Sequence, residues 1–227
     1  MDVTDNLSQI NHTMKQACER SNRERTDVNI IAVTKYVSTN RTLEAIEAGV
    51  THIGENRLEG ALEKWEACQN QAAFHFIGTL QSKKVKHVID KYDYFHSLDR
   101  LSLAKEMQKR CPEGKKIKCF VQVNVSGEDS KEGLSEEELI DFVVSLKNYP
   151  AIEVVGLMTM APFVEDPENT RPFFQKLRYL RDEVRDKNMF HAPCEHLSMG
   201  MSNDYFIAVE EGATFVRIGT QLVGNRE

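Results

Sequence analysis

Apolar residues recur along the chain with two different spacings, one typical of helices and the other of buried strands. Near the start, Val3, Leu7, Ile10, Met14 and Cys18 follow one another at steps of four and three residues, which places them on one face of an amphipathic helix. Further along, short β-branched runs that are apolar on both faces alternate with helical patterns. This alternation is typical of parallel strands covered by helices.

Eight segments have the character of buried strands, and the stretches between them carry helix signals. Gly49 and Gly212 stand where helix C-caps belong, and Ser135 with Glu138 forms a capping box. The predicted strands cover residues 29–35, 51–55, 74–78, 94–98, 117–125, 152–160, 194–200 and 214–219.

The spacing of these strands predicts the topology. Their starts lie roughly 20 to 25 residues apart, except for two wider intervals before the sixth and seventh strands. This rhythm predicts a (β/α)8 TIM barrel preceded by one extra helix, with residues 1–227 in a single domain. An open doubly wound sheet is the alternative, but its six or so strands would leave two of the predicted strands unplaced.

Composition restricts the classes of protein that fit. The chain has 227 residues, of which 41% are apolar and 28% charged, and 29 Lys and Arg against 35 Asp and Glu give a net charge of −6. These values are those of a globular protein rather than of a disordered or fibrous chain. No apolar run approaches the roughly 20 residues of a membrane helix, and the first residues lack the features of a signal peptide. We therefore expect a cytoplasmic protein with no membrane contact.

Several residue types that often mark functional sites carry little signal here. The five cysteines are scattered and never spaced as CxxC, so we expect reduced thiols and no zinc site. His75, His96 and His196 match no metal-binding spacing and are interpreted as structural. Lys83, Lys84 and Lys86 form the one basic cluster, which is typical of a solvated face, and we expect no nucleic-acid binding.

The first predicted strand ends in a lysine. If Ile31, Val33 and Lys35 alternate onto the inward face, the amine of Lys35 rises from the apolar floor of the barrel mouth. Loss of hydration there favours the neutral amine, which can attack a carbonyl and form a Schiff base. The alternative is a lysine in the following loop with its amine in water.

Two segments after the last two predicted strands suit a phosphate group. Barrels often bind phosphate at the loops that follow strands seven and eight. The segment S-M-G-M-S at 198–202 offers two hydroxyls and a glycine, and R-I-G-T at 217–220 adds Gly219 and the Thr220 hydroxyl. Both segments are also compatible with ordinary turns.

Arg217 is predicted to share the inward face of the eighth strand with Phe215 and Gly219. An arginine inside a barrel needs an anion or another acceptor. The acceptor is either a ligand or a buried carboxylate, for which Glu55 is the candidate.

These motifs together resemble the pyridoxal-phosphate homeostasis protein family, whose members are single-domain relatives of the barrel half of bacterial alanine racemase. The resemblance covers essentially the whole chain. It rests on seven ordered motifs at predicted strand ends: I-A-V-T-K at 31–35, H-I-G-E-N-R at 52–57, F-H-F-I-G-T-L-Q at 74–81, V-N-V-S at 123–126, G-L-M-T-M at 156–160, L-S-M-G-M-S-N-D at 197–204 and V-R-I-G-T at 216–220.

The resemblance implies a cofactor and its contacts. Lys35 matches the lysine that carries pyridoxal 5′-phosphate (PLP) as a Schiff base, and Asn56 matches a residue that lines the cofactor. Arg217 matches the arginine that faces the pyridine nitrogen. The residues that match the phosphate site are Ser198, Met199, Gly219 and Thr220.

By this resemblance we expect an intracellular carrier or buffer in vitamin B6 homeostasis rather than a turnover enzyme, monomeric, with apo forms of PLP-dependent enzymes as possible recipients. The leading alternative is an amino-acid racemase. Racemases of similar fold need a second acid/base group, a tyrosine from a separate domain, and this chain ends at Glu227 without one. The third hypothesis is a Schiff-base aldolase that uses Lys35 on a sugar phosphate.

Overall fold

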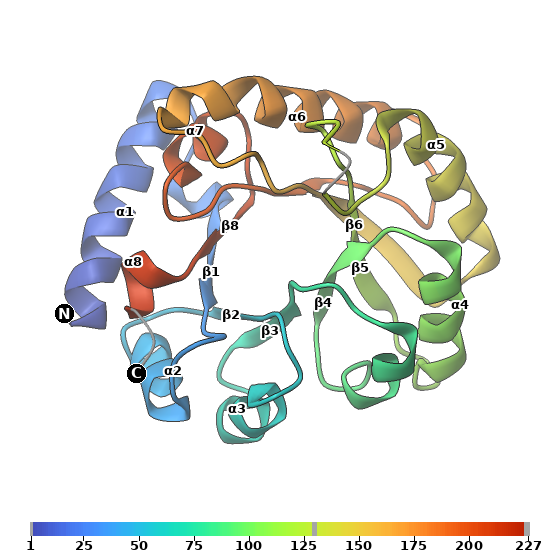
Figure 1. Cartoon of the computed structure of the whole chain (residues 1–227), viewed down its shortest axis with the longest axis horizontal. Helices are drawn as coiled ribbons and strands as arrows, with labels where there is room; N and C mark the ends of the chain where they lie inside the picture. The colour runs from blue at the N-terminus through green and yellow to red at the C-terminus, as the bar shows by residue number, and fades with distance from the viewer. Residues whose placement is uncertain (1, 129–130, 225–227) are drawn as a thin grey trace.

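Eight short parallel strands close into a barrel in the order in which they occur along the chain (Figure 1). The computed structural model describes residues 2–128 and 131–224. The predicted (β/α)8 architecture is therefore confirmed, and the open sheet is excluded. The strands are β1 (Asn29–Val33), β2 (His52–Glu55), β3 (Ala73–Phe76), β4 (Tyr94–Leu98), β5 (Ile117–Gln122), β6 (Ile152–Met158), β7 (His196–Ser198) and β8 (Phe215–Ile218).

Helices surround the barrel (Figure 1). Their buried apolar residues belong to one core that they share with the strands. The predicted signals are present at their ends: Gly49 and Gly212 follow helices with φ of 108° and 100°, and the Ser135–Glu138 capping box is formed. The α-helices are α1 (Val3–Arg20), α2 (Thr39–Glu47), α3 (Ala61–Cys68), α4 (Leu101–Arg110), α5 (Glu136–Ser145), α6 (Arg171–Asp186), α7 (Tyr205–Glu210) and α8 (Thr220–Val223).

The extra helix α1 lies outside the barrel along α7 and α8, so the first helix contacts the last (Figure 1). Its apolar face is buried, as the spacing from Val3 to Cys18 predicted. The amide of Asn6 donates a hydrogen bond of 2.9 Å to the carbonyl of Leu222. This hydrogen bond holds α8, the short helix that follows β8, against α1.

Seven of the eight strands are shorter than predicted, and β4 (Tyr94–Leu98) has its predicted bounds. β1 ends at Val33, two residues earlier than predicted, because the Val37 N–H donates to the Thr34 carbonyl and turns the chain. The basic cluster after β3 lies in a 3-10 helix of six residues, η2 (Ser82–His87), and not in an α-helix.

The first and last strands complete the barrel. β1 and β8 pair in parallel, with Asn29 opposite Phe215 and Ile31 opposite Arg217. The carboxyl ends of β1 and β8 therefore stand side by side, although they are separated by nearly the whole chain. In barrels of this type the loops at the carboxyl ends of the strands carry the functional groups.

The space inside the barrel is filled partly by apolar and partly by polar side chains. The apolar interior residues form one cluster of Ile31, Phe120, Val155, Met158 and Phe215, against which Tyr94 packs. Phe215 also contacts the rings of interior histidines at centroid distances of 5.4 to 5.5 Å. This interior is separate from the larger core between strands and helices.

Candidate binding site at the barrel mouth

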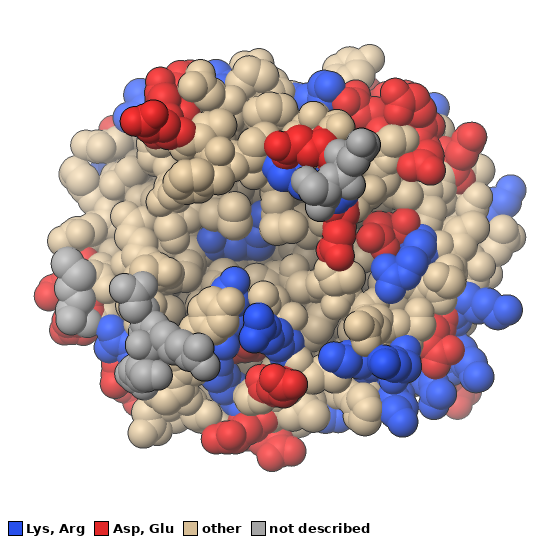
Figure 2. Space-filling view, in the orientation of Figure 1, with Lys and Arg blue, Asp and Glu red and all other residues tan. Residues whose placement is uncertain are grey.

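A cavity of about 510 Å³ opens at the carboxyl ends of the strands. In the space-filling view this face is hollowed near its centre, and Lys or Arg atoms lie in the hollow (Figure 2). Its volume suits a small molecule. The lining residues are Val33, Lys35, Asn56, Ile77, Gly78, Thr79, Gln122, Glu132, Met160, Met201, Ser202, Arg217, Gly219 and Thr220.

Lys35 lines this cavity from the turn after β1, not from the strand itself. Its side chain is half-buried, and its Nζ lies 4.8 Å from the centroid of the Tyr36 ring. Tyr36 is 48% exposed and stands at the rim. Each hypothesis for Lys35 is therefore correct in one respect. The residue belongs to the turn after β1, as the second hypothesis stated, and it lines the cavity, as the first stated.

Arg217 lines the cavity from β8, the strand beside β1, and is 5% exposed. Its guanidinium donates to the Ser198 hydroxyl at 2.7 Å and to the Thr159 carbonyl at 2.9 Å. Burial lowers the pKa of Arg217 to about 10, so the group keeps its positive charge at neutral pH. Arg217 therefore presents a fixed cation to the cavity.

Glu55 is not the partner of Arg217, and that sequence hypothesis is wrong. The Glu55 carboxylate is buried and accepts from the Lys64 amine at 3.0 Å and from the Thr34 hydroxyl at 2.5 Å. Lys64, which is also buried, donates to the Thr34 carbonyl as well. Consecutive strand residues point to opposite faces, so Glu55 faces α3 and not the cavity. The sequence held no local sign of this pair.

The buried Glu55–Lys64 pair braces the backbone behind the site. Thr34 immediately precedes Lys35, and Glu55 immediately precedes Asn56. One lysine on α3 therefore fixes the ends of β1 and β2 relative to each other. Both of these strand ends contribute a side chain to the cavity.

Asn56 brings an unused acceptor to the cavity. Its Oδ1 is buried and has no hydrogen-bond partner among residues 2–128 and 131–224. A buried polar atom without a partner is costly, and such atoms in native proteins usually meet a ligand or an ordered water. Asn56 thus points to a hydrogen-bonding ligand in this cavity.

Two of the residues matched to a phosphate site lie outside the cavity wall. Ser198 is fully buried and bonded to Arg217 and His96, while Met199 packs in the outer core and its N–H donates to the Phe215 carbonyl. Met201 and Ser202 line the cavity instead, together with Gly219 and Thr220. The chain stays in the barrel wall through Met199 and turns only at Gly200, whose φ is 91°.

Methionines also belong to the wall, which the sequence analysis did not anticipate. Met160 and Met201 are 41% and 39% exposed and line the cavity. Gln122 is 3% exposed and lines it from the end of β5, with its amide donating to the Glu132 carbonyl. A signal for Gln122 was available, because it is the polar end of an otherwise apolar strand.

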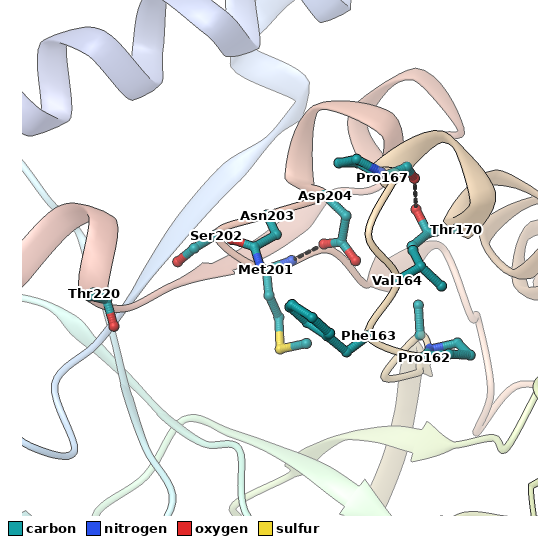
Figure 3. Close-up of a pocket in the computed structure, with 11 residues that line it drawn as sticks. Pro162, Phe163, Val164, Pro167, Thr170, Met201, Ser202, Asn203, Asp204 and Thr220 are labelled. Atoms are coloured by element: carbon teal, nitrogen blue, oxygen red, sulfur yellow. Dashed lines mark hydrogen bonds between the residues drawn. The ribbon is translucent and has the colours of Figure 1, made fainter.

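A second, more apolar cavity of about 420 Å³ adjoins the first across Met201, Ser202 and Thr220. Figure 3 shows the Phe163 ring and the Met201 side chain within it, with the Met201 N–H bonded to the Asp204 carboxylate at 2.6 Å. Burial raises the pKa of Asp204 above its ordinary value. This carboxylate organises the turn that presents Ser202 to the first cavity.

Two of the three histidines that were interpreted as structural, His75 and His96, have a hydrogen-bond partner at each ring nitrogen. His75 and His96 are completely buried and hydrogen-bonded, whereas the Nδ1 of His196 is buried without a partner in the described part of the chain. Burial lowers the pKa of His75 and of His96 well below the ordinary value. Both imidazoles are therefore neutral at pH 7.

Among the described residues, no group of three or more His, Cys, Asp or Glu side chains is arranged to hold a metal ion. A search of the same residues finds no helix with the length and apolar character needed to cross a membrane.

Comparison with known proteins decides the family. The family model for the N-terminal domain of alanine racemase matches residues 6–227. A protein of Aquifex aeolicus, named pyridoxal phosphate homeostasis protein, is 40% identical, and the alignment covers 100% of both chains. This chain belongs to the pyridoxal phosphate homeostasis protein family. The family member of Escherichia coli is 31% identical over 100% of this chain and 97% of its own.

Solved structures agree with this membership. PipY from Synechococcus elongatus, solved with PLP bound, is 30% identical and superposes with a TM-score of 0.83 over 98% of this chain and 100% of its own. Alanine racemase from Corynebacterium glutamicum matches 96% of this chain and 61% of its own, with a TM-score of 0.73 and 16% identity. At that identity the racemase shares the fold alone.

The Glu55–Lys64 pair generates a stability prediction. Lys64→Met should lower the free energy of unfolding by about 3 to 5 kcal/mol, because it leaves a buried carboxylate without its counter-ion. Urea unfolding followed by circular dichroism measures the loss. Lys15→Met is the control, since the Lys15 side chain is 69% exposed. Equal stabilities of the two variants would show that the pair contributes nothing.

The neutral interior imidazoles generate a pH prediction. Below pH about 6.5 the unfolded chain binds protons that folded His75 and His96 do not, so the free energy of unfolding should fall as the pH drops. In His75→Gln the loss between pH 7 and pH 5.5 should be smaller than in the wild type by about 1 kcal/mol. His12→Gln, which removes an exposed imidazole, should retain the wild-type loss. An unchanged loss in His75→Gln would mean that His75 binds a proton as readily in the folded state as in the unfolded state.

Proposed function

We propose that this protein binds PLP in the cavity at the barrel mouth, holds it as a Schiff base on Lys35, and serves as a carrier or buffer in vitamin B6 homeostasis. The observation that carries the proposal is that Lys35, the Arg217 cation and the unpartnered Asn56 oxygen line one cavity of about 510 Å³. The PLP-bound structure of PipY, a full-length relative, supports it.

The residues present fit the chemical groups of PLP. Its aldehyde needs a primary amine, which Lys35 provides. Its dianionic phosphate needs hydroxyl and backbone donors, which Ser202, Gly219 and Thr220 offer on adjoining loops. Its pyridine nitrogen needs a donor, and Arg217 has guanidinium N–H groups beyond the two bonded to the protein.

Ser198 and Met199 take indirect roles in this proposal. Ser198 acts by holding Arg217, and Met199 by packing the loop whose next residues reach the cavity. Direct phosphate contacts are assigned to the other residues of the segments 198–202 and 217–220.

The identity of the residue beside the ring nitrogen favours a carrier over an enzyme. PLP supplies an electron sink when its ring nitrogen is protonated. Arg217 remains charged and has no proton-accepting atom, so it donates a hydrogen bond to an unprotonated nitrogen. The cofactor is then held firmly but is a weak electron sink. We accordingly propose a monomeric cytoplasmic carrier whose recipients are apo forms of PLP-dependent enzymes.

One observation keeps the racemase hypothesis as the second candidate. Racemization requires two acid/base groups on opposite faces of the substrate carbon. Besides Lys35, the nearby Tyr36 has a titratable hydroxyl, and its ring centroid lies 4.8 Å from the lysine amine. Tyr36 is therefore the residue to test for a second role.

The proposed anchor is tested by absorbance. Lys35→Ala should abolish the visible absorption of the PLP-loaded protein and its fixation by borohydride, because no other lysine lines the cavity among the described residues. Lys86→Ala, which removes an exposed lysine, is the matched control and should remain yellow. If the Lys35→Ala protein is still yellow and is still labelled after reduction, the anchor is a different lysine.

The carrier and the racemase are separated by hydrogen exchange. The PLP-loaded protein should incorporate deuterium at the α-carbon of L- or D-alanine in heavy water no faster than free PLP does, because the ring nitrogen stays unprotonated. NMR of the amino acid measures the rate, with Tyr36→Phe as the control. Exchange well above free PLP that is lost in Tyr36→Phe would establish a racemase-like activity in place of the carrier.

A further inference from the structure

A continuous row of hydrogen-bonded side chains crosses the interior of the barrel and ends at the cavity. The Nδ1 of His52 lies 2.9 Å from the Nε2 of His75, and the Nδ1 of His75 lies 2.9 Å from the Nε2 of His96. The Nδ1 of His96 is 2.9 Å from the Ser198 hydroxyl, which accepts from Arg217 at 2.7 Å. We call these five residues the interior row.

One end of the interior row is accessible to solvent, and the other end lies at the cavity. His52 is the first residue of β2 and is half-buried, so its outer nitrogen can meet solvent. His75, His96 and Ser198 are completely buried. Arg217 lines the cavity. The row thus links the amino-terminal end of the barrel to the proposed cofactor site.

Donor and acceptor chemistry fixes the direction of the row. A guanidinium donates hydrogen bonds and cannot accept them, so the Ser198 oxygen must accept from Arg217. The one hydroxyl proton of Ser198 is then free to donate to the Nδ1 of His96. His96 must therefore carry its proton on Nε2 and donate to His75, which donates in the same way to His52.

The opposite direction leaves a buried donor without an acceptor. If His96 donated from Nδ1 to Ser198, the serine oxygen would accept twice and its own proton would need a third partner. Across the described ranges, Ser198 has no side-chain partner besides His96 and Arg217. An unpaired buried hydroxyl is unfavourable. Burial, together with the nearby Arg217 charge for His96, also lowers the pKa of the inner imidazoles, which keeps them neutral.

We propose that His52, His75 and His96 are positioning residues whose protons all sit on Nε2, and that this fixed direction keeps Ser198 an acceptor for Arg217 and so aims the guanidinium into the cavity. The Thr159 carbonyl provides the second anchor, at 2.9 Å from the other terminal nitrogen. Two anchors on a flexible side chain leave its remaining N–H groups directed at a ligand.

The direction of the row is tested without any cofactor. Two-bond ¹H–¹⁵N correlation spectra of the full chain at pH 7 report which nitrogen of each histidine carries the proton, and single substitutions assign the seven histidines. We expect the Nε2–H form for His52, His75 and His96. A proton on the Nδ1 of His96, or a doubly protonated His75, would overturn the proposal.

The consequence for Arg217 is tested by ligand binding and rests on the proposed function. The probes are PLP and 1-deazapyridoxal 5′-phosphate, in which a carbon replaces the ring nitrogen. In His96→Leu, Ser198 loses its acceptor and Arg217 its alignment, so PLP should bind about tenfold more weakly while the deaza analogue binds as to the wild type. His96→Asn, whose Oδ1 replaces Nδ1 as the acceptor for Ser198, should restore PLP binding.

Several results would contradict the positioning role of His96. Equal weakening of both probes in His96→Leu, or unchanged binding of PLP, would overturn the positioning role. Failure of His96→Asn to restore binding, while the variant remains folded by circular dichroism, would overturn it as well. His87→Leu, which removes an exposed imidazole, should bind both probes as the wild type does. If the wild type bound no PLP, the proposed function would fail, and the tautomers alone would still decide the direction of the row.

Discussion

The backbone hydrogen bonds between β1 and β8 are the interaction on which the rest of this molecule depends. They close the sheet and set Ile31 opposite Arg217. With that register, the turn that carries Lys35 and the loop that carries Gly219 and Thr220 border one cavity. Helix α1 strengthens the closure from outside through Asn6 and Leu222, because it binds the segment that follows β8.

A charged arginine inside the barrel is the second constraint, and the closed sheet must satisfy it. Among the described residues, no carboxylate is hydrogen-bonded to Arg217. A serine hydroxyl and a backbone carbonyl accept its hydrogen bonds, and the Asp204 carboxylate acts on it only through its charge. The remaining guanidinium N–H groups are therefore available to a ligand in the cavity. Glu55, a buried carboxylate behind the cavity wall, is paired with Lys64. Because Glu55 pairs with Lys64 behind the wall, it does not compete with a ligand for Arg217.

The local pattern of the sequence determined the architecture. Runs of β-branched residues, the periodicity of the helices, and the caps at Gly49, Gly212 and Ser135 each depend on neighbours within a few residues, so they can be predicted from the order of the chain. The ordered motifs at strand ends likewise indicated the family. Because parallel strands end at the same edge of a barrel, Lys35, Asn56, Arg217, Gly219 and Thr220 could be expected at one mouth, where the structure brings them together.

Contacts between distant segments were decided only by the tertiary structure. Whether Ser198 or Ser202 meets the cavity depends on where the chain leaves the barrel wall, which the turn at Gly200 sets. Glu55 pairs with Lys64 rather than with Arg217 because side chains alternate along β2, and this alternation directs the Glu55 carboxylate toward α3. The interior row joins five strands through side chains whose alignment depends on the stagger of the closed barrel. Strand order and composition can be taken directly from the sequence. The direction of a buried hydrogen bond depends instead on all the donors and acceptors that the fold brings around it.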